Sequence, residues 1–202
     1  MRTTLAAAAA LTLLAACSQE PAPEPTAPAG PESPPVVTPP AEPPASGAPV
    51  LSAQGFPPLR IGMTVAEIDA ALGPDSDPNA VGGPEPESCD VFHPSRAPEG
   101  LLVMVLGGRL DSVWLSRNSA VTTDRGFKIG DTAAAVKQAY GASAVVEPHK
   151  YESAPAEYIT VWATPNHTGP TARGLKYEIG GDGRVRSIAG GGESTQYVEG
   201  CA

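Results

Sequence analysis

The sequence contains few cations and few aromatic residues, which excludes several kinds of partner. Of its 202 residues only 13 are Lys or Arg, against 22 Asp or Glu, and aromatic residues make up 5% of the chain. No basic cluster and no strand of alternating aromatic and basic residues occurs, so nothing in the chain would neutralise the phosphates of a nucleic acid. We therefore expect no nucleic acid partner and no second, electrostatic contact with anionic lipid.

Residue patterns that carry metal or nucleophilic chemistry are also lacking. The three histidines, His93, His149 and His167, have no second histidine or carboxylate three or four residues away on an expected helix, which disfavours a zinc site. The chain has no Gly-x-Ser-x-Gly elbow and no Ser-x-x-Lys pair, so a nucleophilic mechanism has no candidate residue. We expect no metal, no cofactor and no enzymatic activity.

No apolar run is long enough to span a bilayer, but a short one at the start of the chain ends in a cysteine. Arg2 supplies a positive start, residues 5–14 are apolar, and Leu14–Cys17 form a lipobox. This segment resembles the leader of bacterial lipoproteins. The resemblance implies a signal peptide over residues 1–16, a diacylglyceryl group on Cys17, and an acyl chain such as palmitate on the new amino terminus. An ordinary secretory signal is the alternative.

The residue after the lipid cysteine predicts the location of the protein. It is Ser18 rather than the aspartate that inner-membrane lipoproteins carry, so the resemblance implies an outer-membrane lipoprotein. Two or three acyl chains on one residue give a stable membrane anchor. We expect the folded domain in the periplasm, with exposure on the cell surface left open.

Residues 17–50 contain the lipid cysteine and a Pro-rich linker. The tract from Glu20 to Pro49 contains 12 of the 24 prolines and no Lys or Arg. It has too little apolar surface to offset its ordering entropy, so we expect a disordered spacer. At about 3.1 Å per residue it would hold the domain up to roughly 90 Å from the membrane. A ligand for a groove that binds polyproline helices is the alternative.

With Cys17 assigned to lipid, the remaining cysteines form an even pair. An oxidising periplasm should join Cys89 and Cys201 in a disulfide. The alternatives are two buried free thiols or a metal-binding pair.

A repeat organises the rest of the chain. Residues 59–64 match residues 127–132, and each copy opens a short helix that Thr64 or Thr132 caps and a glycine ends. Antiparallel strands are expected after the helices, at 101–106, 110–115, 157–162, 175–179, 185–188 and 195–198. The sequence therefore predicts an α+β domain over residues 51–202. Its two similar halves, about 55–120 and 123–202, would each be a short helix packed on an antiparallel β-sheet.

This arrangement resembles the BamE/SmpA lipoproteins and the tandem-repeat β-lactamase inhibitor proteins. The motif that carries the resemblance is Gly, one residue, Thr and a short helix closed by Gly, followed by antiparallel strands. The resemblance implies a helix-on-sheet unit used as a binding scaffold.

One cluster of residues is a candidate contact patch. His149, Lys150 and Tyr151 follow the second expected helix, and Tyr158 and Trp162 share one face of the next strand. The alternative is that Tyr158 and Trp162 belong to the core while His149 and Lys150 lie in a solvated loop.

These features favour a non-enzymatic lipoprotein of the cell envelope. The expected function is a tethered interaction or scaffold module that binds an envelope protein or a cell-wall partner. The alternatives are an inhibitor of a periplasmic or extracellular hydrolase and an uncharacterised enzyme.

Overall fold

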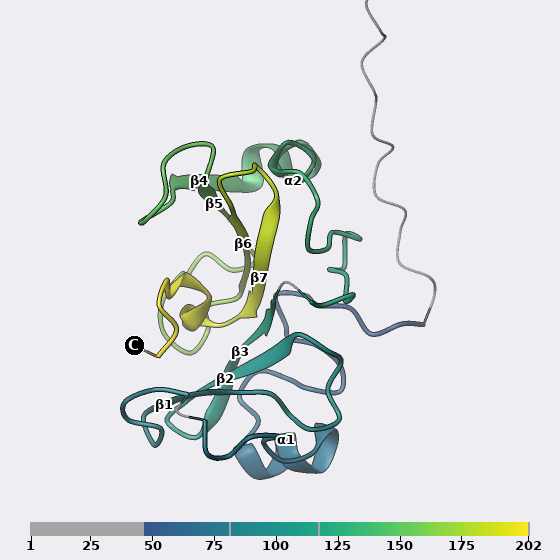
Figure 1. Cartoon of the computed structure of the whole chain (residues 1–202), viewed down its shortest axis with the longest axis vertical. Coiled ribbons are helices and arrows are strands. Elements are labelled where there is room, and N and C mark those ends of the chain that lie inside the picture. The colour runs from purple at the N-terminus through teal and green to yellow at the C-terminus, as the bar shows by residue number, and fades with distance from the viewer. Residues whose placement is uncertain (1–46, 81, 117, 202) are drawn as a thin grey trace, which may run out of the picture. The chain divides into compact units, whose positions relative to one another are not determined.

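Two short helices and one antiparallel β-sheet make up the computed structural model, which describes residues 47–80, 82–116 and 118–201 (Figure 1). The expected signal peptide, Cys17 and linker residues 17–46 lie outside the described residues. The elements, in chain order, are α1 (Val65–Leu72), β1 (Cys89–Phe92), β2 (Leu101–Leu106), β3 (Arg109–Leu115), α2 (Ala133–Tyr140), the 3-10 turn η1 (Gly141–Ser143), β4 (Ala144–Pro148), β5 (Glu157–Trp162), β6 (Gly174–Ile179), β7 (Val185–Gly191) and the 3-10 turn η2 (Glu193–Gln196).

Both helices are capped by the predicted threonine. The Thr64 hydroxyl accepts a hydrogen bond from the backbone N–H of Glu67, and the Glu67 carboxylate accepts one from the backbone N–H of Thr64, which completes a capping box. The Thr132 hydroxyl caps α2 in the same way but has no glutamate to complete the box. At eight residues each, the helices depend on packing for stability. Ile68 and Val136 provide this packing, since both are fully buried in the core.

The sheet is larger than the sequence predicted. All seven strands form one sheet in the order β1-β2-β3-β7-β6-β5-β4, and every pair is antiparallel. The two expected hairpins, β2 with β3 and β6 with β7, do form. They are joined because Ser112–Leu115 of β3 pairs with Ile188–Gly191 of β7. Without this pairing, each hairpin would leave the backbone groups of one more strand edge unsatisfied.

The loops before α1 and α2 contact β3 and β7 in matching ways. The Gly62 N–H donates to the Leu110 carbonyl at 2.7 Å, and the Gly130 N–H donates to the Val185 carbonyl at 2.9 Å. Both glycines have φ of 92°, a left-handed conformation that a larger residue adopts only with strain. Arg109 donates from Nη1 to the Gly62 carbonyl at 3.0 Å, as Arg184 does to the Gly130 carbonyl at 2.8 Å.

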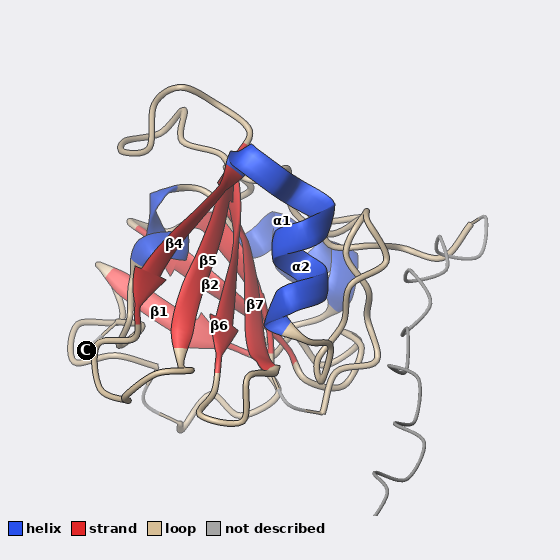
Figure 2. Ribbon diagram, turned by 90° about the horizontal axis from the view of Figure 1, so that it is seen from above, coloured by secondary structure: helices blue, strands red, loops and turns tan. Residues whose placement is uncertain are grey.

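The two faces of the sheet differ in character. The face under α1 and α2, the helix face, contains the hydrophobic core. Its central residues include Val113, Ile159, Tyr177 and Ile188, all fully buried. The opposite face, the open face, displays the alternate residues of the same strands, among them Trp114, Tyr158 and Lys176. Figure 2 shows the strands β4 to β7 fanned beside α2.

The C-terminal segment lies on the open face and is held there by covalent and polar bonds. In Figure 1 it occupies the space between β1–β3 and β6–β7. The backbone N–H of Ser194 donates to Asp111 Oδ2 at 2.8 Å, and the hydroxyls of Ser194 and Ser112 are hydrogen-bonded at 2.6 Å. The predicted disulfide between Cys89 and Cys201 is present.

The strand expected at 195–198 was a wrong prediction. Glu193–Gln196 forms a 3-10 turn instead, because its backbone amides bond to Asp111 and to nearby carbonyls rather than to a neighbouring strand. Two strands were missed, β1 and β4. Among the residues that the structure describes, neither helix is long and apolar enough to cross a membrane.

Removing the disulfide should destabilise the domain considerably. The bond closes a loop across a sequence separation of 112 residues. The chain-entropy model for such a loop predicts a loss of about 4 kcal/mol in the free energy of unfolding for a Cys89→Ser, Cys201→Ser double variant. Urea denaturation of both proteins, with and without reductant, measures this difference. Reductant should destabilise the parent chain and leave the variant unchanged, and equal midpoints for the oxidised proteins would contradict the prediction.

Candidate functional site

The candidate site lies on the open face, centred on Tyr158 of β5. The His149 ring stacks on one face of the Tyr158 ring, with ring centroids 4.6 Å apart. The ammonium of Lys176, on the neighbouring strand β6, lies 4.2 Å from the Tyr158 ring centroid in a cation–π contact. The Tyr158 hydroxyl is buried and has no hydrogen-bond partner in the described part of the chain. Burial raises the pKa of this hydroxyl, so it is a neutral polar group at neutral pH.

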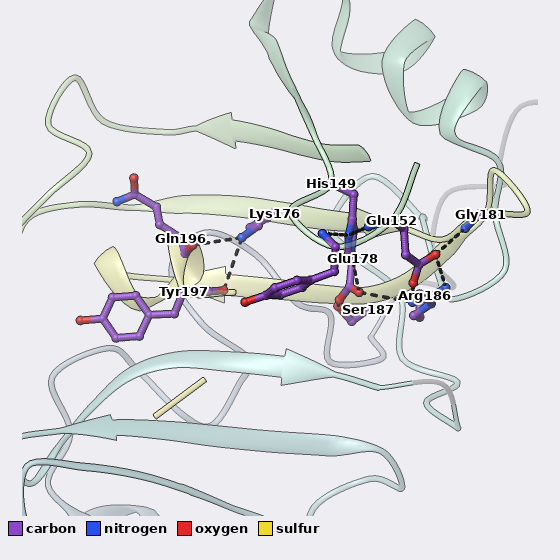
Figure 3. Close-up of polar contacts among 10 residues, drawn as sticks. His149, Glu152, Lys176, Glu178, Gly181, Arg186, Ser187, Gln196 and Tyr197 are labelled. Carbon is purple, nitrogen blue, oxygen red and sulfur yellow. Dashed lines mark hydrogen bonds and ion pairs between the residues drawn. The ribbon is translucent and has the colours of Figure 1, made fainter. Parts of the chain in front are cut away.

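Lys176 is a buried cation that the C-terminal segment stabilises. Its side chain leaves β6 on the open face, and only 8% of the residue is exposed. Nζ donates to the backbone carbonyls of Gln196 at 3.1 Å and Tyr197 at 3.4 Å (Figure 3). Burial lowers the pKa of Lys176, and the negative charges of Glu178 and Glu147 oppose this effect.

His149 holds the loop between β4 and β5 in one conformation. Its Nδ1 accepts hydrogen bonds from the backbone N–H groups of Tyr151 and Glu152, both at 3.1 Å. Its Nε2 lies 3.3 Å from a carboxylate oxygen of Glu178 on β6. This arrangement fits the neutral tautomer with the proton on Nε2, because that tautomer accepts at Nδ1 and donates to Glu178. The Ser187 hydroxyl donates to the other Glu178 oxygen at 2.7 Å.

A bidentate ion pair fixes the end of the same loop. Both carboxylate oxygens of Glu152 bind the guanidinium of Arg186 on β7, and Oε2 also accepts from the backbone N–H of Gly181 at 3.1 Å (Figure 3). The hydrogen bonds from Arg186 hold the pKa of Glu152 below its ordinary value, and the same pair raises the pKa of Arg186. The loop is therefore pinned to the β6–β7 turn at its far end.

The pinned loop presents Lys150 and Tyr151 to solvent. Tyr151 is 59% exposed, the highest value among the exposed large hydrophobic residues that the structure describes. The Lys150 ammonium lies 5.0 Å from the Tyr151 ring centroid and 3.2 Å from a Glu199 carboxylate oxygen. An aromatic ring that protrudes from a rigid loop loses little conformational entropy on binding.

A groove adjoins the loop on the open face. Its volume is about 420 Å³, and Val145, Tyr158, Trp162, Lys176 and Val198 are among its lining residues. The Trp162 ring at its rim stacks on His167, with centroids 4.3 Å apart. Trp162 remains partly exposed, so the groove combines an aromatic rim with a buried cation.

All five predicted patch residues therefore lie in this region, with different exposure. Lys150 and Tyr151 are exposed, and Trp162 is half-buried. The His149 side chain is 5% exposed and Tyr158 is buried, so His149 does not sit in a solvated loop. Neither Tyr158 nor Trp162 belongs to the hydrophobic core cluster on the helix face.

Sequence reasoning missed the charged residues that build the site, namely Lys176, Glu178 and Arg186. In β6, Lys176 and Glu178 alternate with apolar residues, which is also the pattern of a strand face exposed to solvent, and Arg186 lies at an irregularity in the β6–β7 pairing. The register of β5 and β6, which the sequence does not specify, places Lys176 and Glu178 on the open face with Tyr158. No group of three or more His, Cys, Asp or Glu side chains arranged to hold a metal ion occurs within the described ranges.

No protein-family model matches this sequence, and neither a curated protein nor a solved structure matches it.

The ion pair between Glu152 and Arg186 makes the loop between β4 and β5 sensitive to acid. Because the folded pKa of Glu152 lies below the ordinary value of 4.5, its contribution to loop stability is present above pH 4.5 and is lost as the pH falls through the folded pKa. We expect hydrogen-exchange protection of the Gly181 amide to decrease below about pH 4.5 in the parent chain. A Glu152→Gln variant should show reduced protection already at neutral pH and no acid dependence.

The matched control is Glu157→Gln, which removes the ion pair with Lys137 instead. It should leave Gly181 protection unchanged. Identical protection in the parent and the Glu152→Gln variant at every pH would refute the assigned role of this carboxylate.

Proposed function

We propose that this protein is a non-enzymatic lipoprotein of the cell envelope, anchored in the outer membrane through Cys17, whose α+β domain binds a protein or cell-wall partner. The domain stands off the membrane on the spacer of residues 17–50. The resemblance of residues 1–17 to lipoprotein leaders supports the anchor. The disulfide supports export to an oxidising compartment, since such bonds rarely persist in the cytosol.

One observation carries the proposed binding role. Six large hydrophobic residues are exposed in the described part of the chain, and five of them lie on β4, on the loop after it or on the C-terminal segment. These five are Val145, Val146, Tyr151, Tyr197 and Val198. Val145 and Val198 line the same groove, and Tyr197 and Val198 line a second cavity together with Lys150. Val145, Tyr197 and Val198 are therefore grouped around these adjoining hollows, and a grouping of exposed apolar side chains of this kind is typical of an interaction surface.

Tyr151, on the rigid loop, is the residue of this surface that we expect to contribute most to the binding free energy. Tyr side chains on a pre-organised backbone are frequent hot spots of protein interfaces. Residues 149–152 are held from β6, β7 and the C-terminal segment, so the Tyr151 ring is presented without further ordering.

We also propose that the domain arose from two similar halves, 55–120 and 123–202, like the tandem-repeat inhibitor proteins that it resembles. The matched contacts of Gly62 with Leu110 and of Gly130 with Val185 support this origin. An inhibitor of a periplasmic or extracellular hydrolase is the second candidate function, and the identity of the partner separates it from the first.

Crosslinking from the loop tests the binding role. The photoreactive analogue p-benzoylphenylalanine is placed at position 151 of the full-length chain, in the bacterium that makes it. The control position is Val65 on α1, which is 38% exposed and lies on a different part of the domain. We expect a specific adduct from position 151 and none from position 65. A membrane assembly protein or a cell-wall component supports the first candidate, and a secreted hydrolase supports the second.

The purified partner then allows a quantitative test. Tyr151→Ala should weaken binding by roughly thirtyfold, the effect of removing an interface hot spot, and Val65→Ala should not change it. Absence of an adduct at position 151, or equal affinity of the two alanine variants, would overturn the proposed function.

The lipid anchor is tested separately. Cys17→Ala should block processing of the precursor and move the protein from the detergent phase to the aqueous phase in Triton X-114 partitioning, since the acyl chains supply membrane affinity. The matched control is Cys201→Ala, which also removes one cysteine but leaves the lipobox intact, and it should remain in the detergent phase. Unchanged partitioning of the Cys17→Ala variant would exclude lipidation at this residue.

A further inference from the structure

The two edges of the sheet differ in whether another segment of the described chain covers them. At the β1 edge, the segment before the strand lies close to the strand backbone: a Cβ on Gly82 would stand 2.6 Å from the amide nitrogen of Val91, and one on Gly83 would stand 2.9 Å from the carbonyl oxygen of Cys89. Only glycine permits this approach, and it covers the edge. At the opposite edge, no described strand pairs with the outer side of β4.

The register shows which β4 backbone groups point outward. The His149 N–H donates to the Ala156 carbonyl, and the Ala163 N–H on the next strand pair donates to the Arg173 carbonyl. In an antiparallel pair, every second residue of a strand bonds to the partner strand. Either of these two bonds, combined with the register, therefore places the bonds from β4 to β5 at Val145 and Glu147. The C=O of Ala144 and the N–H and C=O of Val146 therefore point away from the sheet, whereas the Ala144 N–H donates to the Gly141 carbonyl of η1. Pro148 is at the third outward position, where its lack of an N–H breaks no bond to β5.

Side-chain space exists on both sides of this edge. On the open face, Val145 and Glu147 line the 420 Å³ groove. On the helix face, Val146 and Ala134 line a second groove of about 580 Å³ between α2 and β4. A strand added to β4 would direct its alternate side chains into these two grooves. Val145 and Val146 are 46% and 44% exposed, so both faces of the edge present apolar surface.

The charge pattern indicates the kind of strand that fits. Glu147 is exposed and forms no ion pair within the described residues. The expected linker and leader hold four of the 22 acidic residues and one of the 13 basic ones, so the rest of the chain has 18 acids and 12 bases. A second copy of this chain would bring the same excess of negative charge to the edge. A segment with a cation opposite Glu147 is complementary to it.

We propose that the outer edge of β4 binds an extended segment of the partner protein by strand addition, and that this segment alternates apolar side chains and carries a Lys or Arg opposite Glu147. The inference rests on the proposed function, since it names the kind of partner segment that the binding surface takes. The Val146 N–H and C=O and the Ala144 C=O supply the hydrogen bonds. The two flanking grooves and Glu147 supply the sequence preference.

Selection of peptides tests the edge directly. Random ten-residue peptides displayed on phage are selected on the purified full-length chain in detergent micelles. We expect the enriched sequences to alternate β-branched or aromatic residues with polar ones and to share a Lys or Arg. A Val146→Pro variant removes one outward N–H and leaves the bonds to β5 in place, so it should weaken binding of these peptides about tenfold or more.

Two further variants make the test specific. Glu147→Lys should replace the selected Lys or Arg by Asp or Glu, a change that a general loss of folding cannot produce. Val65→Pro is the matched control, because Val65 is the first residue of α1, where proline is tolerated, and it should leave selection unchanged.

Three results would overturn the inference: no enriched alternating peptide, peptides that bind the Val146→Pro variant as tightly as the parent, or a dimer of this chain that Val146→Pro dissociates. The last result would identify a second copy as the occupant. If the inference fails while the crosslink from position 151 persists, the proposed function stands and only strand addition is wrong. If the crosslink is lost as well, both proposals fall.

Discussion

The pairing of β3 with β7 is the interaction on which the rest of the structure depends. Without it the first half would be a three-stranded sheet of β1, β2 and β3 and the second a four-stranded sheet of β7, β6, β5 and β4, each with one more open edge. Four residues of β3 bond to four residues of β7, and the result is a continuous seven-stranded sheet. This sheet is wide enough to bury one core beneath two eight-residue helices that would not be stable by themselves. It also leaves only two edges, and of these the chain covers the one at β1.

The open face would be unstable without the C-terminal segment. Lys176 lies on this face with little access to water, and a buried ammonium needs hydrogen-bond acceptors. The carbonyls of Gln196 and Tyr197 meet this need. The segment is fixed in turn at Ser194 by Asp111 and at Cys201 by the disulfide to β1. The disulfide therefore links β1, at one edge of the sheet, to the segment whose carbonyls stabilise the Lys176 ammonium on β6.

Local signals in the sequence predicted the elements well, because their causes are local. The Thr64 cap with Glu67 and the terminating Gly73 define α1 within a few residues, and the alternation of Glu157–Trp162 defines β5. The sequence analysis missed β1 and β4 for two different reasons. Cys89–Phe92 is only four residues long, and Ala144–Pro148 is exposed along most of its length, so neither gives a clear alternating pattern. The single sheet could not be predicted, since the pairing of β3 with β7 is a tertiary contact.

The same distinction applies to the site. His149, Lys150, Tyr151, Tyr158 and Trp162 were found because aromatic and basic residues close in sequence also lie close in space. Arg186 was not found, because its partner Glu152 is 34 residues away in sequence. Lys176 was not found, because an alternating charged residue in a strand has the same pattern whether it faces solvent or a covering segment. Only the path of the C-terminal segment distinguishes the two cases, and that path is set by Asp111 and Cys89, each more than 80 residues away in sequence.

The edge at β4 is open to a further strand because the two halves of the sheet contain different numbers of strands. In the strand order, β1, β2 and β3 occupy positions that mirror β5, β6 and β7, which leaves β4 without a counterpart in the first half. The place that would mirror β4 is taken by the segment around Gly82 and Gly83, whose backbone lies against β1. An irregular, glycine-containing segment covers an edge without offering a new one, whereas a regular strand satisfies its neighbour and exposes its own outer row of N–H and C=O groups. If the two halves are copies, as proposed, the open edge at β4 is a feature that only the second half has. The pinned loop with Tyr151 follows directly from that strand, so the exposed backbone groups and the exposed aromatic ring belong to one continuous stretch of chain.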